Sequence, residues 1–232
     1  MKSIPVTDTV IRLTRYGLVN AYLVREDDGF TLVDATLPKN AGAIIDAARA
    51  AGGSIRRIAL THGHGDHVGS LDELRDVLGP DVPVLMPELD ARIHAGEKVT
   101  ERKPTGSWPK LSTIPDERLK GGDRVGSLEV IDSPGHTPGH VAFLDSRDRV
   151  LIAGDVFSTI GGVAVTSYPY WRFPLPGFVT FDKPENLRSA RALRALDPSV
   201  LVVGHGREVR SPGAAIDAGI ARAERRLGNA AR

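Results

Sequence analysis

The sequence predicts an α/β fold in a single domain that spans residues 1–232. Short β-branched runs alternate with helical segments, a length of 232 residues suits one sizeable domain, and residues of metal-binding type follow several of the strands. A hydrophobic content of 41% and a charged content of 25% are those of an ordinary globular protein. Disorder, collagen and coiled coil are therefore excluded.

The N-terminal third predicts three strands and a helix. The strands are expected at residues 6–13, 18–24 and 30–33, where β-branched runs are separated by turn residues, and consecutive strands of this kind favour antiparallel pairing. Pro38 marks a helix start, and the alanine-rich run 41–51 predicts a helix that ends at Gly52-Gly53.

The middle of the chain predicts two strands separated by a helix, followed by an irregular segment. A buried strand is expected at 55–60, then a polar loop, a helix over 68–78 and a strand over 82–86. From residue 96 to about 120 the periodicity fails, and Pro104, Pro109 and Pro115 interrupt the segment. This pattern indicates a long surface loop or lid.

Strands and helices return in the C-terminal half. Strands are expected at 128–131, 141–144, 150–152 and 200–203, with a helix from Pro184 to about 196 and a closing helix over 214–227. The sequence contains no internal repeat and no linker, which supports the single-domain prediction.

The charge balance and the lack of cysteine exclude several classes of function. A formal net charge of +1 does not favour a nucleic acid or an anionic membrane as partner. Without cysteine there is no disulfide, no thiolate nucleophile and no iron–sulfur site. Two arginine groups are interpreted as solvated helix faces: Arg188, Arg191 and Arg194, and Arg222, Arg225, Arg226 and Arg232.

The start of the chain lacks the apolar run of a signal peptide, and no apolar stretch approaches the roughly 20 residues that span a bilayer. We therefore expect a cytoplasmic protein.

A dense group of metal-binding residues follows the strand expected at 55–60. The segment is Thr61-His62-Gly63-His64-Gly65-Asp66-His67. Imidazole and carboxylate ligands suit zinc or another first-row metal, and the intervening glycines let the backbone turn tightly. The six residues from His62 to His67 cannot themselves complete two coordination spheres, so more ligands are expected from other strand ends.

Three later segments supply residues of the same kind. His136 lies in the Gly/Pro-rich run 133–140, Asp155 follows the strand at 150–152, and His205 stands between two glycines after the strand at 200–203. Each lies at the C-terminal end of a strand, where α/β sheets place their sites.

These motifs, in this order, resemble the metallo-β-lactamase fold superfamily, and the similarity looks closest to uncharacterised bacterial metallo-hydrolases with a glyoxalase II-like or lactonase-like metal set. The resemblance implies a four-layer αββα sandwich with a dinuclear centre at one edge of the two sheets. It also implies one metal bound by His62, His64 and His136, and a second bound by Asp66, His67 and His205. Asp155 would bridge the two.

The resemblance implies a metal-dependent hydrolase with two divalent ions, Zn²⁺ first and Fe or Mn as alternatives. A metal-bridging hydroxide would attack the substrate, and Asp66 would orient the water and shuttle its proton. We expect a small-molecule substrate with an ester-like bond, a lactone or thioester ahead of others.

Several alternatives stay open. Enzymatic alternatives are a phosphodiesterase or nuclease, a β-lactamase-type side activity and a di-iron redox protein, and a non-catalytic binding protein is a further one. Asp155 stands where true β-lactamases of this superfamily have Cys or Ser, which argues against that main activity. Ser158 stands where quorum-quenching lactonases usually have a tyrosine, a role that Tyr168 or Tyr170 could fill.

The aromatic segment 168–181 is the other informative feature. We expect Tyr168, Tyr170, Trp171 and Phe173 to wall an apolar substrate pocket, with a homodimer interface or an aromatic core plug as alternatives. Trp108 is a weaker candidate for the opposite wall.

Three further residues have roles that the sequence leaves less defined. His94 is expected to be solvated on a surface helix, and His140 to support a ligand or the core. Asp34 either supports the metal loop or simply ends a strand.

Overall fold

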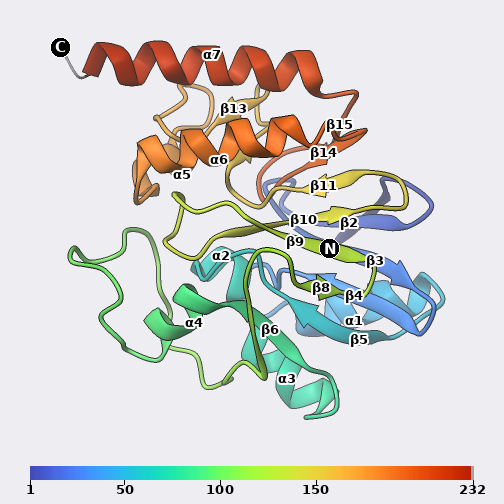
Figure 1. The fold of residues 1–232 in the computed structure, drawn as a ribbon. Coiled ribbons are helices and arrows are strands. Elements are labelled where there is room, and N and C mark those ends of the chain that lie inside the picture. The colour runs from blue at the N-terminus through green and yellow to red at the C-terminus, as the bar shows by residue number, and fades with distance from the viewer. Residues whose placement is uncertain (231–232) are drawn as a thin grey trace.

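Two β-sheets pack face to face, and helices cover the outer face of each sheet, so that the chain forms an αββα sandwich (Figure 1). The computed structural model describes residues 1–230. The predicted fold class is confirmed.

The first sheet has seven strands in sequence order, β1 to β7. The strands β1 to β4 pair antiparallel, as expected for the first strands, and β4 to β7 pair parallel. They are β1 (Lys2–Pro5), β2 (Val10–Arg15), β3 (Val19–Glu26), β4 (Gly29–Val33), β5 (Ile55–Ala59), β6 (Val84–Pro87) and β7 (Glu117–Leu119).

The second sheet has the strand order β15-β14-β11-β10-β9-β8, antiparallel except for the parallel β11–β14 pair. Its strands are β8 (Arg124–Val125), β9 (Leu128–Asp132), β10 (Val141–Asp145), β11 (Val150–Ile152), β14 (Val200–Val202) and β15 (Val209–Arg210). A short hairpin, β12 (Phe157–Ser158) and β13 (Ala164–Val165), lies outside both sheets.

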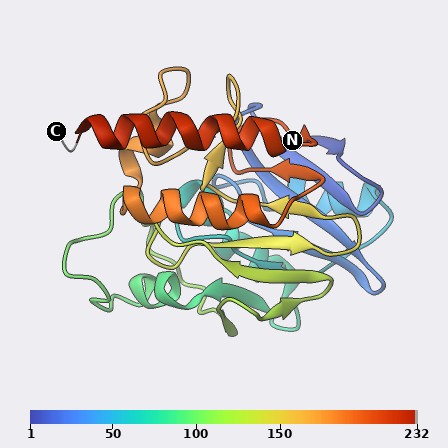
Figure 2. The ribbon, with the colours of Figure 1, turned by 45° about the horizontal axis from the view of Figure 1, so that its top comes forward.

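The helices form the two outer layers. On the first sheet pack α1 (Ala41–Ala50) and α3 (Leu71–Leu78), with the short α2 (Gly65–Val68) and α4 (Glu88–His94) nearby. On the second sheet pack α6 (Lys183–Ala195) and α7 (Gly213–Ala230), which lie side by side in Figure 2, after the short α5 (Leu175–Val179).

Three hydrophobic cores hold these four layers together. Side chains of β3 alternate between two of them, because Leu23 packs under α1 and α3 while Val24 packs between the sheets. The third core lies between the second sheet and α6 and α7, where Leu201 meets Leu187 and Ile216. Sheets buried on both faces explain the strongly hydrophobic strands of this sequence.

Three expected elements differ from the structure. The strand expected at 6–13 begins only at Val10, as β2, and residues 6–9 form a turn that joins it to β1. The Thr7 hydroxyl closes this turn by accepting hydrogen bonds from the backbone N–H groups of Thr9 and Val10. The helix expected over 68–78 is α2 and α3, interrupted at Gly69-Ser70, where the Ser70 hydroxyl bonds the Leu37 carbonyl. The irregular segment 96–120 ends in β7, which joins the edge of the first sheet.

None of the helices within residues 1–230 is long and apolar enough to cross a membrane.

Candidate metal centre

The predicted metal-binding residues come together at one end of the sandwich. His62, His64, Asp66 and His67 follow β5, and His136 lies in the turn between β9 and β10. Asp155 follows β11 and His205 follows β14. The structure places their donor atoms in three overlapping groups, each within 4.8 Å: His62, His64 and His136; His62, His67 and Asp155; Asp66, His67 and His205.

Each of the five histidines has one ring nitrogen held by a neighbouring group, which orients the ring. The pairs are His62 Nδ1 with Thr61 Oγ1 (3.0 Å), His64 Nε2 with the Thr105 carbonyl (3.0 Å), His67 Nδ1 with Asp34 Oδ2 (2.8 Å), His136 Nδ1 with Thr180 Oγ1 (3.0 Å) and His205 Nδ1 with the Leu18 carbonyl (3.0 Å). Partners of this kind fix the tautomer of metal-binding histidines.

The remaining nitrogens point toward one another and toward Asp155. His64 Nδ1 lies 3.1 Å from His136 Nε2. Asp155 Oδ2 lies 3.4 Å from His136 Nε2 and 3.1 Å from His205 Nε2, and its Oδ1 lies 3.5 Å from His67 Nε2. Asp155 therefore stands between the two halves of the site.

Unpaired buried atoms show that this donor set fits a cation. Within the described residues, His62 Nε2, His67 Nε2 and Asp155 Oδ1 are buried and have no hydrogen-bond partner. Leaving a buried polar atom unpaired costs about 1–3 kcal/mol. A metal ion bound by the lone pairs of these three atoms would explain why they lie together without hydrogen-bond partners.

The electrostatics of the site favour the metal-binding protonation states at His62 and Asp155, but not at His67 and His205. Burial, together with the neighbouring His67, His64 and His136, lowers the pKa of His62 well below its usual value. Burial alone would raise the pKa of Asp155, but His205 and His67 hold that pKa well below its usual range. His62 is therefore a neutral imidazole and Asp155 an ionised carboxylate. Although burial lowers the pKa of His67 and of His205, Asp34 and Asp155 raise the pKa of His67 well above its usual value, and Asp155 raises that of His205 to about 10. A metal ion would therefore displace a proton from each of these two rings.

Asp34 supports the metal loop, as one of its two interpretations predicts. Its carboxylate accepts hydrogen bonds from the Thr61 N–H (2.8 Å) and hydroxyl, besides holding His67 Nδ1. Asp34 reaches this position with a φ of 64°, a backbone conformation in which aspartate is tolerated better than most residues. His140 also acts as a support, because Nδ1 pairs with Ser133 Oγ (2.9 Å) and Nε2 accepts the Asp155 N–H (3.0 Å).

Asp90 on α4 is a supporting residue that the sequence analysis did not identify. Its buried carboxylate accepts three hydrogen bonds: from the Gly63 N–H (2.9 Å), the Thr137 hydroxyl (2.7 Å) and the Gly139 N–H (2.8 Å). It thereby joins the loop after β5 to the β9–β10 turn. Burial raises the pKa of Asp90 to about 6, although the three hydrogen bonds oppose the rise.

The loop that carries His205 is held from the opposite sheet by residues that the sequence analysis also missed. The Tyr22 hydroxyl donates to the Val203 carbonyl (2.6 Å) and accepts from its N–H (3.1 Å). The Asn20 amide and the Arg12 guanidinium donate to the Gly206 carbonyl at 2.8 Å and 2.7 Å.

Gly204 is required beside the donor atoms, because any Cβ at this position would overlap Asp155 Oδ1 and the His67 ring. Loop backbone and ligands are therefore packed without room for a side chain.

The expectation that His94 is solvated is wrong. His94 is partly buried, and its Nε2 pairs with the Gly63 carbonyl (2.8 Å). The His94 ring packs against Trp108, with 5.2 Å between their ring centroids. The Trp108 indole also packs edge-on against His64, with 5.3 Å between the centroids. Trp108 thus contacts a predicted ligand directly.

The aromatic segment divides between two places. Phe173 packs against His205, with 5.2 Å between ring centroids. Tyr168, Tyr170 and Trp171 instead line a separate cavity next to α7. Beside Asp66 lies another cavity of about 430 Å³, bordered mostly by apolar groups of Leu37, Pro38, Val68, Pro109 and Leu111, with Lys110 among them.

Fold and site together define a metal-binding hydrolase of the metallo-β-lactamase type. The chain belongs to the metallo-beta-lactamase superfamily, whose family model matches residues 14–205. Its hydrolytic activity follows from that membership.

Three similar proteins illustrate this relationship. "Uncharacterized protein YobT" of Bacillus subtilis (strain 168) is 44% identical over 200 residues, which cover 84% of this chain and 85% of YobT. A hydroxyacylglutathione hydrolase of Bdellovibrio bacteriovorus is 31% identical over 146 residues, 61% of this chain, which span half the length of that enzyme. The structure of TTHA1623 in a di-iron-bound form is 28% identical and covers 90% of this chain and 96% of its own, with a TM-score of 0.66.

Proposed function

We propose that this chain is a dinuclear metal-dependent hydrolase that cleaves a small thioester or lactone. The observation that carries the proposal is the convergence of seven donor residues from four strand ends, with Asp155 in contact with both halves of the site. One ion would be held by His62, His64 and His136, and the other by Asp66, His67 and His205. Zinc and iron both suit such ligands, and TTHA1623 holds two irons.

Bound divalent ions supply Lewis acidity and lower the pKa of water. Asp66 is placed to take the proton of the attacking water, since a third of its side chain is exposed and its Oδ2 lies 3.3 Å from His205 Nε2. The Leu18 carbonyl holds the His205 ring at Nδ1, so that Nε2 and this carboxylate oxygen would face the same ion.

The cavity of about 430 Å³ beside Asp66 suits the part of the substrate next to the scissile bond. Its apolar border of Leu37, Val68 and Leu111 favours an acyl chain or ring. Its charged residues are Lys110, Asp66 and Asp72, so the cavity has no excess of positive charge. We rank thioesters first among the candidate substrates because one relative is a hydroxyacylglutathione hydrolase, whose name denotes a thioester substrate.

A hydrolysis screen on metal-reconstituted protein tests this function. The panel holds a 2-hydroxyacyl thioester, a lactone, a phosphodiester and a β-lactam, with Asp66→Asn and Asp155→Ala as inactive variants and Asp76→Asn, exposed on α3, as the matched control. We expect turnover of the thioester or lactone in the parent and the control alone. Turnover of the phosphodiester only, or oxygen consumption without hydrolysis, would contradict the proposal.

A further inference from the structure

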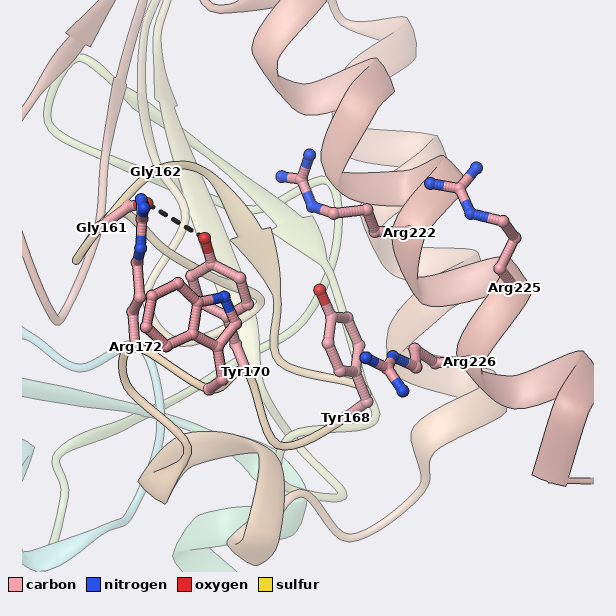
Figure 3. Close-up of a pocket in the computed structure, with 9 residues that line it drawn as sticks. Gly161, Gly162, Tyr168, Tyr170, Arg172, Arg222, Arg225 and Arg226 are labelled. Atoms are coloured by element: carbon pink, nitrogen blue, oxygen red, sulfur yellow. Dashed lines mark hydrogen bonds between the residues drawn. The ribbon is translucent and has the colours of Figure 1, made fainter.

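A cavity of about 620 Å³ lies between α7 and the segment 161–172, apart from the pocket beside Asp66 (Figure 3). Four arginines and several aromatic rings form its border. We call it the arginine pocket, and it is defined by Arg172, Arg222, Arg225, Arg226, Tyr168 and Trp171. Its volume lies in the range of small-molecule sites, about 300–1,000 Å³.

The arginine pocket has an excess of positive charge. Arg222, Arg225 and Arg226 lie at i, i+3 and i+4 on one face of α7, where like charges repel. Among the described residues, no carboxylate lines the cavity or forms an ion pair with its four arginines.

The arginines of the neighbouring helix are different. Arg188, Arg191 and Arg194 of α6 are paired with Glu185, Glu224 and Asp217. Those three therefore match the solvated, ion-paired helix face that the sequence predicts. On α7 the interpretation as a solvated helix face holds only in part, because the exposed Arg225 and Arg226 both border a cavity. Arg232 lies outside the described residues.

Arg222 carries the strongest sign of a missing partner. Its Nη2 donates to the Val163 carbonyl, which fixes the guanidinium at the border of the cavity. Its Nε is buried and has no hydrogen-bond partner among the described residues. A buried guanidinium N–H without an acceptor is unfavourable. Arg222 also forms no ion pair with a described carboxylate, so its charge at the border of the cavity is left unbalanced.

The facing wall is rigid and aromatic. The Tyr170 hydroxyl (3.0 Å) and Arg172 Nη1 (2.7 Å) both donate to the Gly161 carbonyl, so the segment is held in place. Arg172 stacks on the Trp171 ring at 4.7 Å, and Trp171 is 75% exposed. Figure 3 shows Tyr168 between Tyr170 and Arg226, with its hydroxyl directed into the cavity.

We propose that the arginine pocket binds a small organic phosphate that carries a planar ring, with its phosphate on the arginines of α7 and its ring against Trp171. Guanidinium forks match phosphate oxygens, and phosphate esters carry up to two negative charges at neutral pH, which suits several arginines better than one carboxylate does. The exposed indole offers a stacking surface for the ring. The binding does not depend on the reaction at the metal centre.

Calorimetric titration of the metal-loaded protein with ADP and with pyrophosphate tests this assignment without any need for turnover. The variant Arg225→Gln/Arg226→Gln removes two charges on the exposed side of α7, and Arg188→Gln/Arg191→Gln removes two charges from α6 as the matched control. We expect the α7 variant to weaken ADP binding by about tenfold or more, as the loss of two charge-assisted contacts implies, and the control to leave it unchanged. Circular dichroism verifies that both variants fold.

Two further comparisons separate the ring from the phosphate and the arginine pocket from other sites. Trp171→Leu should weaken ADP binding and leave pyrophosphate binding unchanged. Equal ADP affinity in the α6 and α7 variants would place the ligand at the metal centre or in the general field of the protein, and would overturn the proposal. Binding of a single-stranded oligonucleotide but not of ADP would overturn it as well.

Discussion

Replacement of Asp90 by asparagine should change both the pH dependence of stability and the affinity for metal. The buried carboxylate has a pKa raised to about 6, from 3.8 in the unfolded chain. The folded protein therefore holds this proton more tightly. The resulting stabilisation is fully present below pH 3.8 and is lost as the pH rises through about 6.

The magnitude follows from the same two values. A rise from 3.8 to about 6 corresponds to about 3 kcal/mol of unfolding free energy over the whole transition, of which about 1 kcal/mol falls between about pH 5 and pH 7. Asp90→Asn cannot ionise and so should lose this slope. At neutral pH the Asp90 carboxylate stays ionised because it accepts hydrogen bonds from Gly63, Thr137 and Gly139.

Urea unfolding of the metal-free protein across this pH range measures the slope, and chelator competition measures metal affinity. We expect Asp90→Asn to show a smaller change of unfolding free energy with pH than the parent. We also expect it to bind metal about 10–100-fold more weakly, because the asparagine NH₂ group must face at least one of the three hydrogen-bond donors that the carboxylate accepts from. Asp76→Asn, an exposed substitution on α3, is the control. An unchanged slope together with unchanged metal affinity in Asp90→Asn would refute this reasoning.

Three other substitutions test the supports of individual ligands. Asp34→Asn should favour the wrong tautomer of His67 and lower metal affinity by about 10–100-fold in chelator competition; parental affinity would contradict that support. Thr180→Val leaves the His136 N–H without its acceptor and should lower the unfolding free energy by about 1–3 kcal/mol in urea. Tyr22→Phe removes both hydrogen bonds to Val203 and should cost a similar amount, about 1–3 kcal/mol. Urea midpoints equal to the parent's would show that these two hydroxyls contribute nothing.

The sequence predicted the layers, and it predicted that the candidate ligands come together, because these signals are local. A buried run followed within a few residues by a histidine or aspartate beside glycine marks the end of a strand, and His62, His136, Asp155 and His205 all have this context. The turn at residues 6–9, which delays β2 to Val10 and separates it from β1, was missed for a local reason too. This turn is closed by Thr7, a residue that otherwise favours strands.

The supporting residues were missed because their partners lie far away in the chain. Asp90 is one polar residue on an ordinary-looking short helix, and its acceptor role appears only when Gly63 and Gly139 are brought to it. His94 looks like a surface residue until the Gly63 carbonyl packs above it. The composition of the segment 168–181 indicated a pocket wall, but the arginines of α7 that complete the cavity are more than forty positions away.

Metal content and turnover, measured on the same preparation, test whether the seven donor residues form a dinuclear hydrolytic site. We expect two metal ions per chain and metal-dependent hydrolysis of an ester-like bond, with both reduced sharply in Asp155→Ala, since that carboxylate stands between the two halves of the site. Two ions and full turnover in Asp155→Ala, or full turnover of the parent with metal removed, would contradict this expectation.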